Sequence, residues 1–167
     1  MLTSHEILGF MSPQLALEIL VYSHEADKPL YHATVAAVAQ VRHVRPVFLE
    51  RQPRTQRHTA MLGTLTRPAL EPAAANLIRT WLLKKHNAML VDFLNLLGIA
   101  HKEGVVEENL PDAMDEAKLR SAVDTLLAKY PPEVVAIYLN AFAEMNEVEW
   151  PALKNILESD KRVQLAG

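Results

Sequence analysis

Hydrophobic side chains recur at helical spacing along nearly the whole chain, and the prolines fall where helices would begin. Thr3 followed three residues later by Glu6 has the pattern of a capping box, which predicts a first helix through Phe10. Further helices are predicted to begin at Ser12–Pro13, Asp27–Pro29, Pro53, Asp115, Pro131–Pro132 and Pro151.

The longest helical pattern covers residues 73–97 and ends at Gly98, in the position that favours a left-handed backbone. We expect it to be the central helix. No strand pattern of useful length is present, although "GVVEE" (104–108) could form a short extended piece. The fold class predicted is all-α, a compact single-domain bundle of about seven to nine helices around the helix at 73–97. Residues 1–167 are expected to form one domain, with a weak breakpoint near 66–72, where Pro68 and Pro72 lie.

Composition narrows the class of protein. The chain has 167 residues, half of them apolar, which is enough for a sizeable core and excludes wholesale disorder. There is no cysteine, and hence no disulfide or thiolate site. The N-terminal residues lack a signal-peptide pattern, and no run approaches the roughly 20 apolar residues of a membrane span. We expect a cytoplasmic location and no membrane partner.

Charge is distributed unevenly along the chain. The net charge is −3, but residues 1–85 carry +4 and residues 86–167 carry −7. The stretch "VRHVRPVFLERQPRTQRH" (41–58) holds five of the nine arginines, none of the eight lysines and a single acid, Glu50. Guanidinium groups suit bidentate contacts with carboxylate or phosphate. The candidate binding residues are Arg51, Arg54, Arg57 and His58, followed by Arg42 and Arg45.

Three interpretations of this arginine-rich segment remain open. The arginines could pair with acids of the same chain, namely Glu103, Glu107, Glu108, Asp112, Asp115 and Glu116. The arginine-rich segment and these acids could instead meet between subunits of a homo-oligomer, or either could contact another protein. They could also bind an anionic small molecule that carries a phosphate group. Nucleic acid is disfavoured, because only Phe48 offers a stacking surface nearby.

No catalytic motif accompanies these residues. The sequence has no nucleophile elbow, no phosphate-binding glycine loop and no histidine pair at metal-ligand spacing. We assign no catalytic residue, no metal site and no cofactor, although a metal site assembled across helices from His24, Asp27 and His86 stays open. His86 and His101 are secondary candidates for a ligand site between helices, and His101 is more simply a residue of a polar turn.

The function expected from the sequence is therefore a helical protein-interaction or self-associating module without catalytic activity. The alternative is a protein that binds a small ligand or anion through residues 42–58, with an enzyme as the less supported version of it. No part of the sequence carries the signature of a family, and a helical bundle by itself transfers no function.

Overall fold

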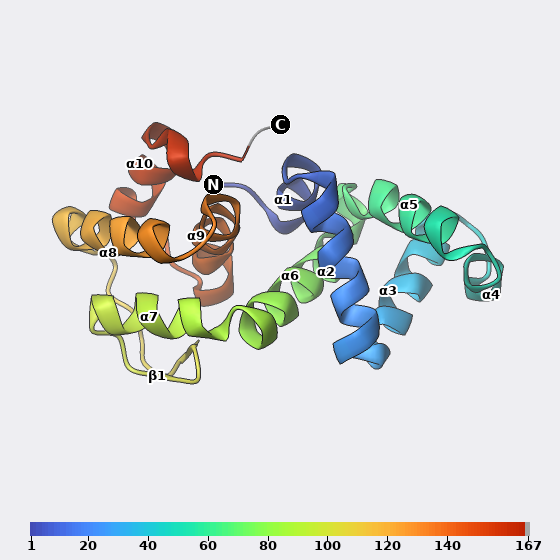
Figure 1. Ribbon diagram of the computed structural model, residues 1–167, viewed down its shortest axis with the longest axis horizontal. Helices are drawn as coiled ribbons and strands as arrows, with labels where there is room; N and C mark the ends of the chain where they lie inside the picture. The colour runs from blue at the N-terminus through green and yellow to red at the C-terminus, as the bar shows by residue number, and fades with distance from the viewer. Residues whose placement is uncertain (166–167) are drawn as a thin grey trace. The chain divides into compact units, whose positions relative to one another are not determined.

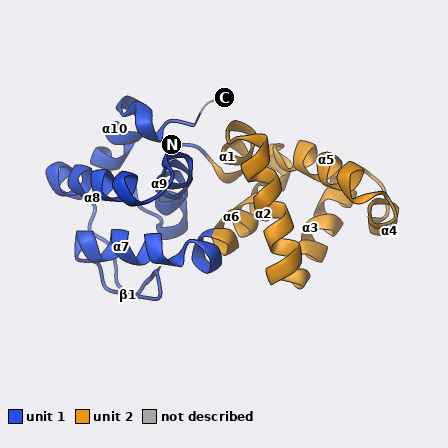
Figure 2. Ribbon diagram, viewed as in Figure 1, with its two compact units in different colours: residues 1–2, 82–165 blue, residues 3–81, 166–167 orange. Residues whose placement is uncertain are grey.

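The computed structural model describes residues 1–165, and it confirms the all-α class (Figure 1). Over these residues the chain forms ten α-helices, two 3-10 turns and one two-stranded hairpin, so the helices outnumber the seven to nine expected. The described chain divides into two compact units, with the division between Trp81 and Leu82 (Figure 2). Unit 2 contains residues 3–81, and unit 1 contains residues 1–2 and 82–165. That the chain forms one domain stays a prediction.

Unit 2 contains the N-terminal helices, and α6 runs from it into unit 1. The elements of unit 2 are α1 (Ser4–Phe10), α2 (Pro13–Ala26), α3 (Lys28–Val41), α4 (Pro46–Glu50), α5 (Arg54–Leu65), η1 (Pro68–Leu70) and most of α6 (Glu71–Lys85). Those of unit 1 are α7 (Asn87–Leu97), β1 (His101–Lys102), β2 (Val105–Val106), α8 (Glu116–Lys129), α9 (Pro132–Asn146), α10 (Pro151–Ser159) and η2 (Lys161–Val163).

Helix starts follow the predicted capping residues. The Ser12 hydroxyl accepts a hydrogen bond from the Leu15 N–H at the start of α2. The side chains of Asp27 and Asp115 cap α3 and α8 in the same way. Such caps satisfy backbone N–H groups that have no partner inside the helix. At α1, the Glu6 carboxylate accepts from the Thr3 N–H, as expected of a capping box.

The single helix predicted at 73–97 is wrong, because the chain forms α6 and α7 with a break at His86. His86 leaves helical geometry at φ −110° and ψ 28°. Beside it, the Asn87 side-chain amide donates to the Glu103 carbonyl and so ties the start of α7 to the hairpin. Asn favours such side-chain to backbone bonds over a helix interior. At the other end of α7, Gly98 has the predicted left-handed backbone, with φ 69°.

In unit 1, α9 takes the central place that was expected of residues 73–97. Ten consecutive residues of α9, Val134–Ala143, are buried, so every side of this helix is covered. Phe142 lies 5.3 Å from Phe93 and 5.3 Å from Trp150 between ring centroids. The Phe93–Phe142 contact is edge-to-face, and the Phe142–Trp150 contact is tilted. Aromatic contacts add to the free energy gained from burial. The short extended piece expected within residues 104–108 is present as β2, which pairs with β1 in a hairpin.

The core of unit 2 is built from one face of each helix. Tyr31, Val35 and Val38 form the buried face of α3, and His58, Met61 and Leu65 form that of α5. Both sets recur every three or four residues, as an amphipathic helix requires. The Glu71 carboxylate accepts hydrogen bonds from the backbone N–H groups of Ser4 and His5, which anchors α1 to the start of α6.

In the described part of the chain, no helix combines the length and the apolar character that crossing a membrane requires.

Candidate functional site

The arginine-rich segment lies entirely in unit 2, around the short helix α4. The helix α3 ends at Val41, before the chain reaches Pro46. His43, with φ 56°, turns the chain out of the helix, and the Val44 N–H donates to the Ala39 carbonyl. Pro46 instead occupies the first position of α4, where its missing N–H costs no hydrogen bond. The arginines of the segment therefore come from three helices: Arg42 follows α3, Arg45 and Arg51 flank α4, and Arg54 and Arg57 lie in α5.

The five arginines of the segment have few polar partners. The Arg42 guanidinium donates to the Thr64 hydroxyl at 3.3 Å, and that of Arg57 donates to the Glu50 carbonyl at 3.1 Å. The side chains of Arg45, Arg51 and Arg54 are exposed and form no hydrogen bond or ion pair with any residue from 1 to 165. The one acid of the segment, Glu50, lies 3.8 Å from the His32 ring. Three guanidinium groups are therefore available to a ligand or partner.

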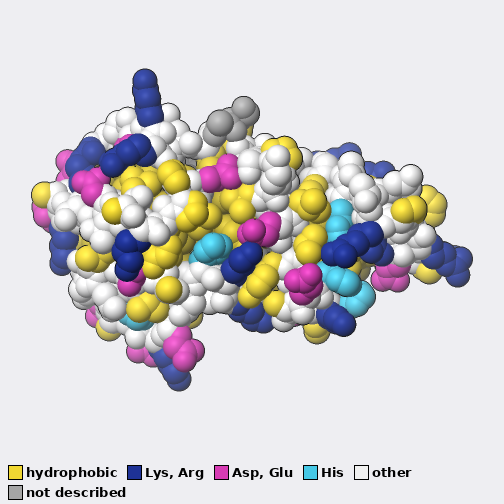
Figure 3. All heavy atoms as spheres, in the orientation of Figure 1, with side chains coloured by type: hydrophobic (Ala, Val, Ile, Leu, Met, Phe, Trp, Pro, Cys, Tyr) yellow, Lys and Arg dark blue, Asp and Glu magenta, His cyan; other side chains and the backbone are white. Residues whose placement is uncertain are grey.

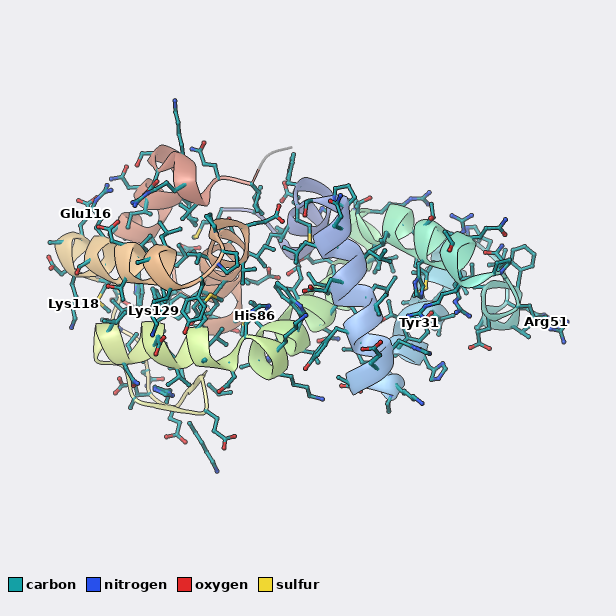
Figure 4. The ribbon with its side chains drawn as sticks, in the orientation of Figure 1. Tyr31, Arg51, His86, Glu116, Lys118 and Lys129 are labelled. Atoms are coloured by element: carbon teal, nitrogen blue, oxygen red, sulfur yellow. The ribbon has the colours of Figure 1, made fainter. Side chains whose placement is uncertain are left out.

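A shallow hollow of about 610 Å³ lies over α4. We name its lining the α4 surface: Val44, Arg45, Val47, Phe48, Arg51, Gln52 and Pro53. Phe48 is 55% exposed and Val47 is 44% exposed, which is unusual for large apolar side chains. Figure 4 shows Arg51 at the α4 end of unit 2, directed outward. The α4 surface thus combines apolar contact area with two guanidinium groups that have no partner among the residues the structure describes.

A buried pair of polar side chains joins α3 to α5. The Tyr31 hydroxyl and the His58 Nε2 share a hydrogen bond of 3.0 Å, and the two residues are only 2% and 4% exposed. The His24 ring from α2 meets the Tyr31 ring edge-on, with centroids 4.5 Å apart. The Arg57 guanidinium lies 6.0 Å from the Tyr31 ring centroid. Figure 4 labels Tyr31, the residue that α3 contributes to this cluster.

This cluster is electropositive. Burial lowers the pKa of His58 to about 4, and the nearby charges of Arg57 and Arg54 act in the same direction. Burial also lowers the pKa of His24, and Arg54 contributes to that shift as well. Both histidines are therefore neutral at pH 7. On the face shown in Figure 3, basic side chains and histidines gather over the region of α2, α3 and α5.

A groove of about 490 Å³ runs between α2 and α5, and His58 contributes to its lining. Leu17 and Val21 come from one face of α2, and Leu62 comes from α5. Arg54 and Thr55 line the same groove from the first turn of α5. The groove therefore has apolar walls and one formal positive charge.

The two secondary candidates lie in unit 1. His86 is the half-buried N-cap residue of α7. His101 accepts the Gly104 N–H at its Nδ1, and its Nε2 lies 2.8 Å from the Asn95 Oδ1. These two bonds hold the hairpin, whose Gly104 has φ 87°. His101 thus has contacts that account for it as a turn residue.

The acids proposed as partners of the arginines also lie in unit 1. The Glu108 carboxylate accepts the Ala100 N–H, and that of Glu116 contacts Arg120 and Asn155. The side chains of Glu103, Glu107 and Asp112 are exposed and form no hydrogen bond or ion pair within the described chain. Val105, next to them in the hairpin, is 44% exposed. Pairing of these acids with the arginines of the same chain stays a prediction.

Sequence reasoning missed Tyr31 and considered His24 only as a metal ligand, although both residues complete the surroundings of His58. The sequence did indicate that His58 would be buried, since residues 58, 61 and 65 have helical spacing and two of the three are apolar. That spacing places His58 on the buried face of α5. Nothing in the sequence indicates that Tyr31 lies opposite, because this contact joins residues 27 positions apart.

No group of three or more histidine, aspartate or glutamate side chains within residues 1–165 is arranged to hold a metal ion. In comparisons with protein-family models, curated proteins and solved structures, none matches the chain.

Proposed function

We propose that the protein is a helical self-associating module, in which the α4 surface of one copy binds the acidic connector, residues 103–116, of a second copy. The observation that carries the proposal is the exposed Phe48 and Val47 beside the guanidinium groups of Arg45 and Arg51, which have no hydrogen-bond or ion-pair partner within residues 1–165. Aromatic side chains and arginines are enriched where proteins bind each other. A purely solvated surface would not require the two large apolar side chains.

Charge complementarity selects the partner. The connector presents three carboxylates without partners in the described chain, those of Glu103, Glu107 and Asp112, beside the exposed Val105. Each side of the proposed interface thus offers an apolar side chain flanked by charges, and the charges are opposite in sign. Opposite potentials raise the association rate and fix the register of two surfaces.

A charge-swap experiment tests this proposal. We expect Arg45→Glu with Arg51→Glu to abolish association, and Glu107→Arg with Asp112→Arg to do the same. The chain that carries all four substitutions should associate again, because both charges are reversed together. Sedimentation velocity at micromolar concentration measures the outcome.

The matched controls are Arg67→Glu in unit 2 and Glu158→Lys in unit 1, both of which are exposed and outside the proposed contact. They should associate like the unaltered chain. A protein that remains monomeric, or a swapped chain that does not recover, contradicts the proposal.

A further inference from the structure

The groove between α2 and α5 is a second feature of unit 2, and it is separate from the α4 surface. Its α2 wall carries Leu17 and Val21, spaced four residues apart on one face of the helix. Leu17 is 42% exposed although its neighbour on the same helix, Leu20, is fully buried. An apolar wall of this kind gains free energy when a ligand removes it from water.

The polar side of the groove comes from α5. Arg54 lines the groove and has no hydrogen-bond or ion-pair partner among the residues described, and the same holds for the Thr55 hydroxyl. The Thr59 hydroxyl is already used, since it donates to the Thr55 carbonyl at 2.9 Å. The groove thus offers one guanidinium and one free hydroxyl as donors.

His58 makes the floor of the groove uncharged. The ring is 4% exposed, and its Nε2 is held by the Tyr31 hydroxyl. Arg57 does not add a second free cation, because its guanidinium donates to the Glu50 carbonyl and lies against the Tyr31 ring. The formal charge that lines the groove is therefore +1, which matches a ligand with a single negative charge.

We propose that this groove binds a small amphiphilic monocarboxylate, with the carboxylate on Arg54 and Thr55 and the apolar chain along Leu17, Val21 and Leu62. The volume of about 490 Å³ falls within the usual size of small-molecule sites, about 300–1,000 Å³. A planar guanidinium can hold both oxygens of a carboxylate, and the threonine hydroxyl adds a third donor. An anion without an apolar chain would leave the α2 wall in water. This inference does not rest on self-association, because none of these residues belongs to the α4 surface.

Isothermal titration calorimetry with four probes tests the site: decanoate, decan-1-ol, acetate and decyl phosphate. We expect one decanoate per chain, below the concentration at which decanoate forms micelles. Acetate should bind at least about 100-fold more weakly, because it cannot contact the apolar wall. Decan-1-ol should bind about tenfold more weakly, because it lacks the charge that Arg54 recognises. Decyl phosphate tests whether the site prefers a phosphate or a carboxylate head group. Tighter binding of decyl phosphate than of decanoate would overturn the carboxylate assignment.

Two variants locate the site. Arg54→Gln should weaken decanoate binding about tenfold, and Leu17→Glu should abolish it by placing a carboxylate in the groove. Both positions are exposed, so folding should be retained, and Arg67→Gln serves as the control for loss of an arginine. In the unaltered chain, the amide signals of Thr55 and Thr59 should shift as decanoate is added. Equal binding by the Arg54→Gln variant, equal binding of acetate, or the absence of these shifts would overturn the inference.

Discussion

The two units differ in what their arginines contact. In unit 1 both arginines bind carboxylates: Arg162 lies 2.8 Å from Asp124 and 2.7 Å from Asp160, and Arg120 lies 3.1 Å from Glu116. In unit 2, the arginines at 42, 45, 51, 54 and 57 form no ion pair with any residue in the described part of the chain. Arginine is thus paired with carboxylates in unit 1, whereas in unit 2 the guanidinium groups of Arg45, Arg51 and Arg54 remain available at the surface. Burial separates the regions in the same way, since unit 1 buries Phe93, Tyr138, Phe142 and Trp150, whereas α4 exposes Phe48.

The largest effect should come from the aromatic core of unit 1. Phe142 is fully buried and contacts Phe93, Tyr138 and Trp150. Phe142→Ala should lower the free energy of unfolding by about 3–5 kcal/mol, because it removes buried apolar surface and leaves a cavity. Urea denaturation followed by circular dichroism measures the loss. A loss below about 1 kcal/mol would contradict the packing described for unit 1.

The buried cluster of unit 2 should make stability depend on pH. The pKa of His58 is about 4 in the folded chain, against about 6.5 for an unperturbed histidine. Between these values the unfolded state binds more protons, so stability is complete above about pH 6.5 and falls as the pH drops toward 4. The contribution of His58 is about 1–3 kcal/mol. Denaturation of the unaltered chain at several pH values measures the slope.

The groups that face His58 are Tyr31 from α3, Arg54 and Arg57 from α5, and His24 from α2. His24, whose pKa is also lowered, acts in the same direction. His58→Gln should therefore flatten most of the pH dependence between 4 and 6.5, and His24→Gln should flatten less of it. A slope unchanged by His58→Gln would contradict this assignment.

A smaller effect on stability is expected at the contact between α7 and the end of α8 in unit 1. The Tyr130 hydroxyl donates to the Asp92 carboxylate at 2.5 Å. The hydrogen bond from Lys129, and after it that from Tyr130, lowers the pKa of Asp92. Tyr130→Phe should cost about 0.5–1.5 kcal/mol in unfolding free energy, the usual net contribution of one hydrogen bond. The pKa of Asp92, followed by NMR, should rise in this variant. No rise would show that the hydroxyl does not act on Asp92.

The smallest effect on stability should come from α4. Phe48→Ala should change the free energy of unfolding by no more than about 0.5 kcal/mol, because the side chain is more exposed than buried. The same substitution should weaken self-association markedly, since Phe48 is the large apolar side chain of the proposed contact. Thermal unfolding and sedimentation of one sample separate the two effects. A loss of stability comparable with that of Phe142→Ala would mean that Phe48 supports the fold instead.

Local signals predicted most helix starts correctly. Capping residues and prolines identified the starts of α1, α2, α3, α8, α9 and α10, because the groups that cap a helix lie next to it in sequence. The break at His86 was missed, since the apolar pattern continues across it and the decisive bond from Asn87 reaches residue 103. Lys84 and Lys85 could have indicated that a helix ends just before His86, because basic residues are favoured in the last turn of a helix.

The candidate site was predictable only in part. The density of arginines between 42 and 57 was visible in the sequence, as was their separation by Pro46 and Pro53. That Phe48 would be exposed while Leu49 is buried depends on how one short helix packs. The partnership of His58 with Tyr31, and the groove beside it, required the packing of α2, α3 and α5.

The molar mass in solution, measured by light scattering on a sizing column, tests the central claim most directly. The column is run at about 0.01 M salt, where charges interact over about 30 Å, and at about 1 M salt, where they interact over about 3 Å. We predict twice the mass of one chain at low salt and a shift toward one chain at high salt, with Arg45→Glu and Arg51→Glu together giving one chain at both. The mass of a single chain at both salts for the unaltered protein would contradict the claim.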